Sequence, residues 1–193
     1  MTNTTMHELS RMVDGNTVPA AGKWQIDPAH TSVEFVGRHL MVTKVRGAFA
    51  DVSGTIVVAE NPLESEVSVV IATDSVSTGA ADRDGHLKSE DFFDVEQFPE
   101  MTFASTAVRR KGDAWVLDGV LTVKDTSKPV SLDFEFLGLI DDPWGNPKAA
   151  FSGRTEIQRS DWNLNWNVAL ETGGVLVSKT IAIEIEVQAA PAE

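Results

Sequence analysis

Apolar and polar residues alternate with a period of two through most of this chain of 193 residues. The pattern is clearest near the C-terminal end, where every second residue is a branched apolar one: Ile181, Ile183, Ile185 and Val187. A period of two places these side chains on one face of an extended strand and the polar residues on the other. A chain with this pattern must bury one face of a sheet, which predicts an all-β fold.

About eight such runs occur, with turn-sized connections between them. We place the strands at residues 31–39, 47–58, 65–72, 101–109, 115–123, 130–137, 149–157 and 177–188. No part of the chain alternates strand and helix as a parallel sheet requires. The pattern therefore predicts an antiparallel barrel or sandwich, and eight strands can close a barrel around one small ligand.

Residues 78–103 differ from the rest, because the alternation fails there. Ser89, followed by Glu90 and Asp91, is typical of a helix start, since acidic residues favour the positive end of the helix dipole. Pro99 prevents a helix from continuing further. The stretch also brings four aromatic rings close together, at Phe92, Phe93, Phe98 and Phe103. We expect a short helical excursion that is either a lid over the space between the strands or a satellite of the core.

The net charge of -13 limits what the protein can bind. Nucleic acid and anionic lipid surfaces both require clustered Lys and Arg, and the acidic composition argues against them. With 42% hydrophobic residues and no apolar run long enough to cross a bilayer, we predict one soluble domain without stable membrane insertion. Cysteine is absent, which excludes disulfides, a thiolate nucleophile and cysteine metal ligands.

Residues 1–22 form a polar leader ahead of the strand pattern. They hold no basic region followed by an apolar one, so no secretory signal is predicted, and the lack of cysteine also fits a cytoplasmic location. Met6, Leu9, Met12 and Val13 can line one side of two helical turns. We favour a frayed tail here, and the alternative interpretation is a plug for one barrel mouth.

Several separated motifs resemble the YceI-like family. They are RDGHLKSEDFFD, FPEMTFAS and GVLTVKDTSKPVSL, preceded by WQIDPAHTSVEFVGRHLMVTKVRGAF and followed by RSDWNLNWNVALETGGVLVSKTIAIEIEVQ. The resemblance covers residues 24–188 and implies a lipocalin-like antiparallel β-barrel over residues 23–190. It further implies that the barrel holds a long apolar lipid, such as a polyisoprenoid, an isoprenoid quinone or a fatty acyl lipid. It is also compatible with a homodimer.

Because of the family resemblance, we expect apolar strand faces to line a ligand cavity. From the pattern alone, apolar faces usually form a packed core, and a register error of one residue would exchange the faces. The predicted ligand-binding residues are Phe35, Phe92, Phe93, Phe98, Phe103, Leu117, Leu121, Phe134, Phe136 and Trp166.

The four histidines, at positions 7, 30, 39 and 86, show no short-spaced pair of the kind that zinc sites use. We expect their side chains to hydrogen-bond backbone groups where loops meet strands. The alternative hypothesis is that His30, His39, Arg83 and His86 meet at one barrel mouth and hold the polar head of a ligand.

Evidence for catalysis is weak throughout. The sequence has no Gly-x-Ser-x-Gly elbow and no phosphate-binding glycine loop, so we predict neither an enzyme nor a cofactor or metal. The alternative enzyme hypothesis is a metal-assisted reaction at a group formed by His30, His39, Asp84 and His86.

A third hypothesis comes from residues 160–168. There Trp162, Leu164 and Trp166 alternate with three asparagines, which predicts a strand with one apolar and one amide face. Such a strip is typical of sites where sugars stack, so a carbohydrate-binding β-sandwich is a further alternative. The matching family segment usually reads closer to DFGV, and Asn163 takes the place of its glycine.

Overall fold

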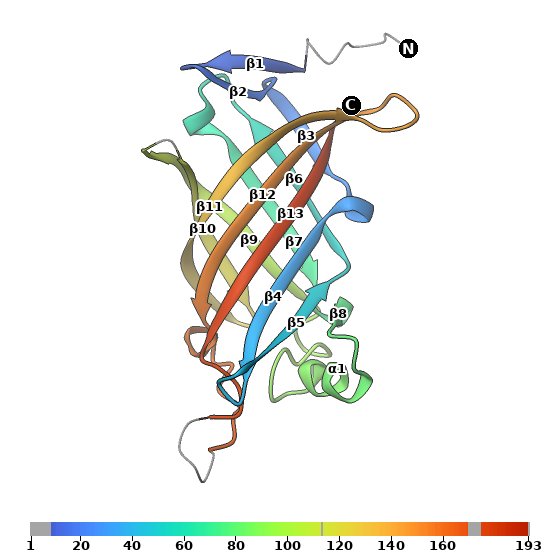
Figure 1. The fold of residues 1–193 in the computed structure, drawn as a ribbon, viewed down its shortest axis with the longest axis vertical. Coiled ribbons are helices and arrows are strands. Elements are labelled where there is room, and N and C mark those ends of the chain that lie inside the picture. The colour runs from blue at the N-terminus through green and yellow to red at the C-terminus, as the bar shows by residue number, and fades with distance from the viewer. Residues whose placement is uncertain (1–8, 113, 170–174, 193) are drawn as a thin grey trace.

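The computed structural model describes residues 9–112, 114–169 and 175–192, and it is a tall antiparallel β-barrel (Figure 1). Around the wall the order is β12-β11-β10-β9-β7-β6-β3-β13, and β13 pairs again with β12 to close the ring. The predicted eight-stranded barrel with a short helical excursion is confirmed. The strands of the wall are β3 (Gly22–Ile26), β4 (Ser32–His39), β5 (Thr43–Phe49), β6 (Val52–Val58), β7 (Glu66–Ala72), β8 (Val76–Ser77), β9 (Glu100–Lys111), β10 (Ala114–Val123), β11 (Thr126–Asp141), β12 (Pro147–Gln158) and β13 (Thr180–Pro191).

Three paths along the wall are each divided into two strands. β3 and β4 lie one after the other beside β13, which pairs with both. Between them is the 3-10 turn η2 (Pro28–His30), which the Asp27 side chain caps by accepting the N–H of Ala29. β5 and β6 are divided in the same way, so the run predicted at residues 47–58 is part of two strands. β7 and β8 are separated by η4 (Thr73–Ser75), and η3 (Pro62–Glu64) precedes β7.

The helix of the excursion is α1 (Ala81–Lys88), so the prediction that a helix starts at Ser89 was wrong. Ser89 instead ends the helix, because its N–H and its hydroxyl both donate to the carbonyl of His86. Asp82 and Asp84 are the acidic residues of the first turn. Short turns then lead the chain to β9. Figure 1 shows α1 at one end of the barrel.

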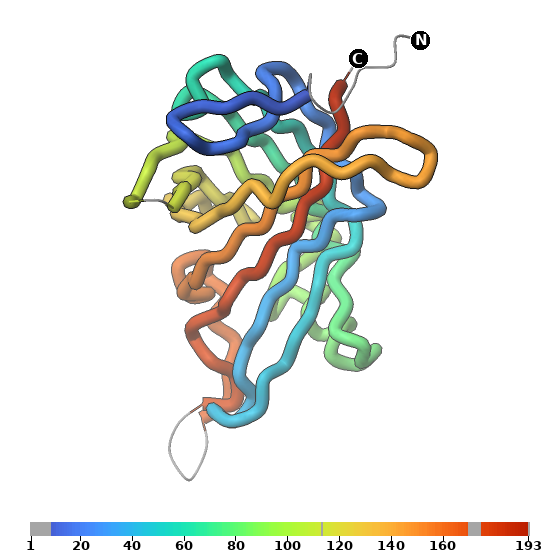
Figure 2. Tube along the Cα trace, turned by 45° about the horizontal axis from the view of Figure 1, so that its top comes forward, coloured from blue at the N-terminus to red at the C-terminus, as the bar shows by residue number. Residues whose placement is uncertain are grey.

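A β-hairpin covers the opposite end of the barrel (Figures 1 and 2). It consists of β1 (Ser10–Val13) and β2 (Asn16–Pro19), so the frayed tail that we favoured is wrong for these residues, and Leu9, Met12 and Val13 form no helical turns. The reason is the turn itself, since Asp14 and Gly15 both have positive φ, which favours a tight hairpin over a helix. Met6 and His7 lie outside the described residues.

Residues 160–168 do not form the predicted strand. The 3-10 turn η5 (Arg159–Trp162) begins the segment, and no strand follows it before residue 169. Asn163 ends the turn with φ 60, in the left-handed region that asparagine tolerates better than most side chains. This is a backbone conformation that glycine adopts readily.

Two buried apolar clusters lie at the two ends of the barrel. The hairpin end is packed by Trp24, Ile26, Ile56, Val58, Ala149 and Ala189. The α1 end is packed by Phe49, Val52, Ile71, Val76, Met101, Val123, Trp162 and Leu164. Within the ranges that the structure describes, no helix is long and apolar enough to cross a membrane.

Candidate ligand cavity

The barrel encloses a cavity of about 760 Å³ with a predominantly apolar wall. This volume falls within the roughly 300–1,000 Å³ typical of small-molecule sites. The cavity runs from Val18 and Pro19 of the hairpin to Arg83 and His86 of α1, so it spans the length of the barrel. Every path along the wall contributes inward apolar side chains.

Some inward side chains are only half-buried, which distinguishes this interior from a packed core. On β13 the cavity is lined by Ile181, Ile183, Ile185 and Val187, all of intermediate exposure. Branched side chains on the inner face of a filled barrel would be fully buried. Their exposed fraction is therefore surface turned toward an internal space.

Glycines on neighbouring strands make room for two inward aromatic rings. Phe35 pairs directly with Gly47, and a Cβ added at Gly47 would overlap the Phe35 ring. The ring of Phe103 covers Gly119 of the adjacent β10 in the same way. These contacts fix both rings against the wall and leave the axis of the barrel open.

The structure places all but one of the predicted ligand-binding residues on the cavity wall. Those that line it are Phe35, Phe92, Phe93, Phe103, Leu117, Leu121, Phe134, Phe136 and Trp166. Phe98 does not line it. The carbonyl of Phe98 accepts a hydrogen bond from Thr73 Oγ1 at 2.7 Å, and its ring lies 5.7 Å from Lys124 Nζ, outside the cavity.

Aromatic side chains join α1 to the wall at this end of the cavity. The ring of His86 meets that of Trp166 at 4.5 Å and that of Phe92 at 5.0 Å, both edge to face. Phe93 contacts Phe49 of β5 at 5.4 Å. The excursion is thus a cover over one mouth whose inner surface belongs to the cavity.

The predicted polar group at the mouth is assembled only in part. His39, Arg83 and His86 line the cavity at the α1 end, where His86 Nε2 is 3.0 Å from Asp91 Oδ2. His30 lies apart from them, because it precedes β4, whereas His39 ends that strand. The sequence could not show that the two histidines lie at opposite ends of one strand.

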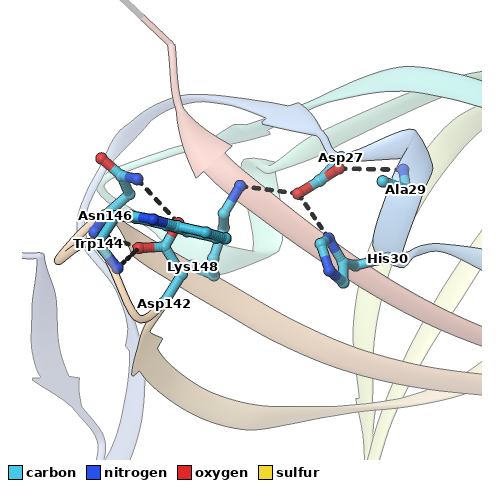
Figure 3. A network of polar contacts seen from close by, with 7 residues as sticks. All are labelled: Asp27, Ala29, His30, Asp142, Trp144, Asn146 and Lys148. Carbon is cyan, nitrogen blue, oxygen red and sulfur yellow. Dashed lines mark hydrogen bonds and ion pairs between the residues drawn. The ribbon is translucent and has the colours of Figure 1, made fainter.

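His30 belongs instead to a network on the outside of the barrel (Figure 3). Its Nδ1 is 3.0 Å from Asp27 Oδ2, and the same oxygen accepts a hydrogen bond from Lys148 Nζ at 2.8 Å. Hydrogen bonds from Lys148, His30 and the backbone of Ala29 outweigh the effect of burial and lower the pKa of Asp27 to about 2.

Arg159 is a cavity residue that sequence reasoning missed. Its side chain is only 5% exposed, and it lines the cavity near Trp166 and Leu164. The guanidinium donates to the carbonyls of Ser178 and Leu164. Burial lowers the pKa of Arg159. The available signal was an arginine directly after an alternating strand, at the point where the chain turns inward.

The sugar-binding strip of residues 160–168 does not exist on the surface. Trp162 is 2% exposed and donates from Nε1 to the carbonyl of Leu121 at 3.0 Å. Asn167 uses its side chain to bond the backbone of Val177. The closed barrel also rules out the sandwich.

Among the described residues, no three His, Asp or Glu side chains converge as metal ligands would.

Fold and cavity together define a lipocalin-like barrel that encloses an apolar space. Residues 24–189 match the YceI-like domain, so the chain belongs to the YceI-like family. It is 39% identical to the protein YceI of Salmonella newport over 151 residues, which are 78% of this chain and 79% of the relative. A UPF0312 protein of Pectobacterium atrosepticum shows the same identity and coverage.

Solved structures support the same assignment. A YceI protein of Campylobacter jejuni is similar with a TM-score of 0.68 and 31% identity, over 81% of this chain and 90% of that chain. A polyisoprenoid binding domain from Saccharophagus degradans has a TM-score of 0.65 at 16% identity, over 88% of this chain and 98% of that chain. The similarity to the Saccharophagus degradans domain shows a shared fold.

Proposed function

We propose that this protein binds a long apolar lipid inside its barrel and sequesters or carries it. The observation that carries the proposal is the cavity inside the barrel, toward which the half-buried aliphatic side chains of β13 are turned. A space that runs the length of the barrel suits a long thin tail better than a compact polar metabolite. Each methylene that enters such a space contributes about 0.8 kcal/mol.

A polyisoprenoid, an isoprenoid quinone and a fatty acyl chain all have tails of this kind. The isoprenoid is supported by the similar fold of the Saccharophagus degradans domain, which is described as polyisoprenoid binding. Isoprenoid transport or storage is the role that we propose for the complex. A homodimer is a further proposal, which light scattering on the purified protein tests directly.

We propose binding as the activity of this protein, in preference to catalysis. The histidines proposed for a metal-assisted reaction are divided, since His30 pairs with Asp27 outside the barrel while His39 and His86 line the far mouth. The side chain of Asp84 is taken up by the backbone and hydroxyl of Thr78. These contacts favour structural roles for the residues of the enzyme hypothesis.

The first test is mass spectrometry of an organic-solvent extract of the purified protein, with native mass spectrometry of the intact protein. We expect a long-chain lipid at a stoichiometry near one. Protein made in a host that lacks the ligand must then take up added isoprenoids or fatty acids. An empty extract combined with no uptake of either class would contradict the proposal.

A matched pair of variants tests where the lipid binds. Phe134 lines the cavity and its neighbour Glu135 is exposed on the outside of β11. Phe134→Lys places a charge in the apolar interior and should weaken lipid binding strongly, whereas Glu135→Lys should leave it unchanged. Circular dichroism confirms that both variants are folded. Equal affinity in the two folded variants would place the lipid outside the barrel.

A further inference from the structure

Two arginines at the α1 end of the cavity have no carboxylate within ion-pair distance among the described residues. Arg83 donates from Nε to Thr78 Oγ1 at 2.7 Å and from a terminal nitrogen to the Thr78 carbonyl at 3.1 Å. Arg159 donates to the carbonyls of Ser178, at 3.0 Å, and Leu164. All these acceptors are neutral. The charge of Arg83 acts on the nearby Asp84 carboxylate and helps to lower its pKa, whereas Arg159 has no acidic group among its bonded partners.

Other arginines of the chain do pair with acids. Arg46 is 2.9 Å from a carboxylate oxygen of Glu184, and Arg109 pairs with Asp118 on the outside of the barrel. The chain has 29 acidic residues against 16 Lys and Arg, so acids are not scarce. Arg110 and Arg154, elsewhere on the wall, also have no carboxylate within ion-pair distance among the described residues. What distinguishes Arg83 and Arg159 is that both also line the apolar cavity.

Arg83 and Arg159 belong to the same mouth. Trp166, which follows η5, meets His86 of α1 at 4.5 Å. Leu164, whose carbonyl Arg159 bonds, packs in one buried cluster with Leu87 of α1. The two guanidinium groups thus come from opposite sides of the contact between α1 and the segment after β12.

Few negative charges face this mouth. Asp82 is the one acidic side chain among the described residues that line the cavity. The Asp84 carboxylate accepts hydrogen bonds from Thr78, which lower its pKa together with the nearby charge of Arg83. Asp91 is engaged by His86.

Arg38 adds positive charge to the rim. It lines the cavity at the end of β4, and its guanidinium donates to the carbonyl of Val42 at 3.2 Å. An uncompensated charge next to an apolar wall costs free energy, and a counter-charge in the site removes much of that cost. Guanidinium groups match carboxylates and phosphates in geometry as well as in charge.

We propose that Arg83 and Arg159 bind an anionic head, a carboxylate or a phosphate, of the lipid whose tail occupies the barrel. This inference rests on the proposed lipid binding and deepens it, because it separates anionic lipids from neutral quinones and alcohols with the same tail. Arg83 is exposed at the entrance and meets the head first, while Arg159 is buried at its inner side.

Lipids with matched tails test the proposal on the full-length protein after removal of copurified lipid. Geranylgeranyl monophosphate is compared with geranylgeraniol, and palmitate with hexadecanol, by calorimetry or by displacement of a fluorescent lipid. We expect the anionic member of at least one pair to bind about tenfold tighter or better. Because Arg83 is exposed, added salt should reduce the difference in affinity between the anionic and the neutral lipid.

Variants test whether Arg83 and Arg159 cause the preference for anionic lipids. Arg83→Met should remove most of the preference for the anionic head. Arg159→Lys retains the positive charge but loses the planar guanidinium group. It should reduce the preference less than Arg83→Met and should still fold. The control is Arg46→Met, which removes an arginine on the outer face and should change neither affinity.

The outcomes separate this inference from the proposed function. Equal binding of anionic and neutral lipids by the natural protein would overturn the anionic head and leave lipid binding intact. A preference that persists in both the Arg83 and Arg159 variants would overturn the role of these arginines. Failure of every lipid to bind would overturn the proposed function itself.

Discussion

Lys148 Nζ lies 2.8 Å from Asp27 Oδ2, and both side chains are less than a fifth exposed. The pair joins the turn after β3 to the start of β12 across β13 (Figure 3). Asp27 also caps η2 through the N–H of Ala29. One carboxylate therefore fixes the break between β3 and β4 and attaches it to the rest of the wall.

The Asp27 pair makes stability depend on pH in a defined direction. Since the pKa of Asp27 is lowered from 3.8 to about 2, its stabilising effect is complete above the unfolded pKa and is lost as the pH falls through the folded pKa. Asp27→Asn should lower the free energy of unfolding by about 2 kcal/mol at pH 6, or the melting temperature by roughly 4–8 °C. The gap between variant and natural protein should narrow from about pH 5 to pH 2.

Thermal unfolding of both proteins across this pH range provides the measurement. Lys148→Met serves as a control, because it removes the partner and should reduce the same pH dependence. A gap that stays constant down to pH 2 would show that Asp27 is not held as an ionised partner in the fold.

The hairpin β1–β2 should determine how the hairpin end of the cavity is closed. Val18 is 5% exposed and lines the cavity, and Arg11 holds the hairpin to the carbonyls of Ala59 and Glu60. A chain that starts at residue 20 keeps the matched domain and loses this cover. We expect bound lipid to dissociate faster and longer tails to be accepted. Dissociation rates for a series of tail lengths check this, and identical rates at every length would exclude a role of the hairpin in closure.

The sequence predicted the barrel because its wall follows a simple rule. Inward positions such as Leu117, Leu132 and Ile183 fall on the alternating pattern, and the observed strands lie within a few residues of most predicted ones. That the inward side chains leave a cavity between them did not follow from the pattern. An inward apolar side chain has the same sequence signature whether it packs on others or faces a cavity.

The mouth was harder to predict because its residues are far apart in the chain. Arg83 and Arg159 both line this mouth only because α1 packs against the segment after β12, and no local pattern encodes that packing. His30 and His39 are close in sequence but lie at opposite ends of β4. The start of α1 was missed because Ala80 provides no side-chain cap, while Ser89 offers a capping residue type at the wrong end.

Gly119 is expected to be indispensable for the position of Phe103. A Cβ at Gly119 would overlap the Phe103 ring and approach the carbonyl of Ala104 at 2.7 Å. Gly119→Ala should therefore cost about 1–3 kcal/mol through overpacking. The control is Gly85→Ala, because nothing lies within 4 Å of a Cβ there and alanine favours the helix α1. Chemical denaturation compares the two, and a stable Gly119 variant would mean that the ring has room to move aside.

Tryptophan fluorescence should report ligand binding from particular positions. Trp115 and Trp166 line the cavity, whereas Trp144 is 83% exposed at the tip of the β11–β12 hairpin. A tail that enters the barrel replaces water beside the first two rings, so their emission should shift to the blue when lipid is added. Trp166→Phe should reduce this shift, and Trp144→Phe should leave it intact. A response carried mainly by Trp144 would mean that added lipid contacts the outer hairpin in preference to the cavity.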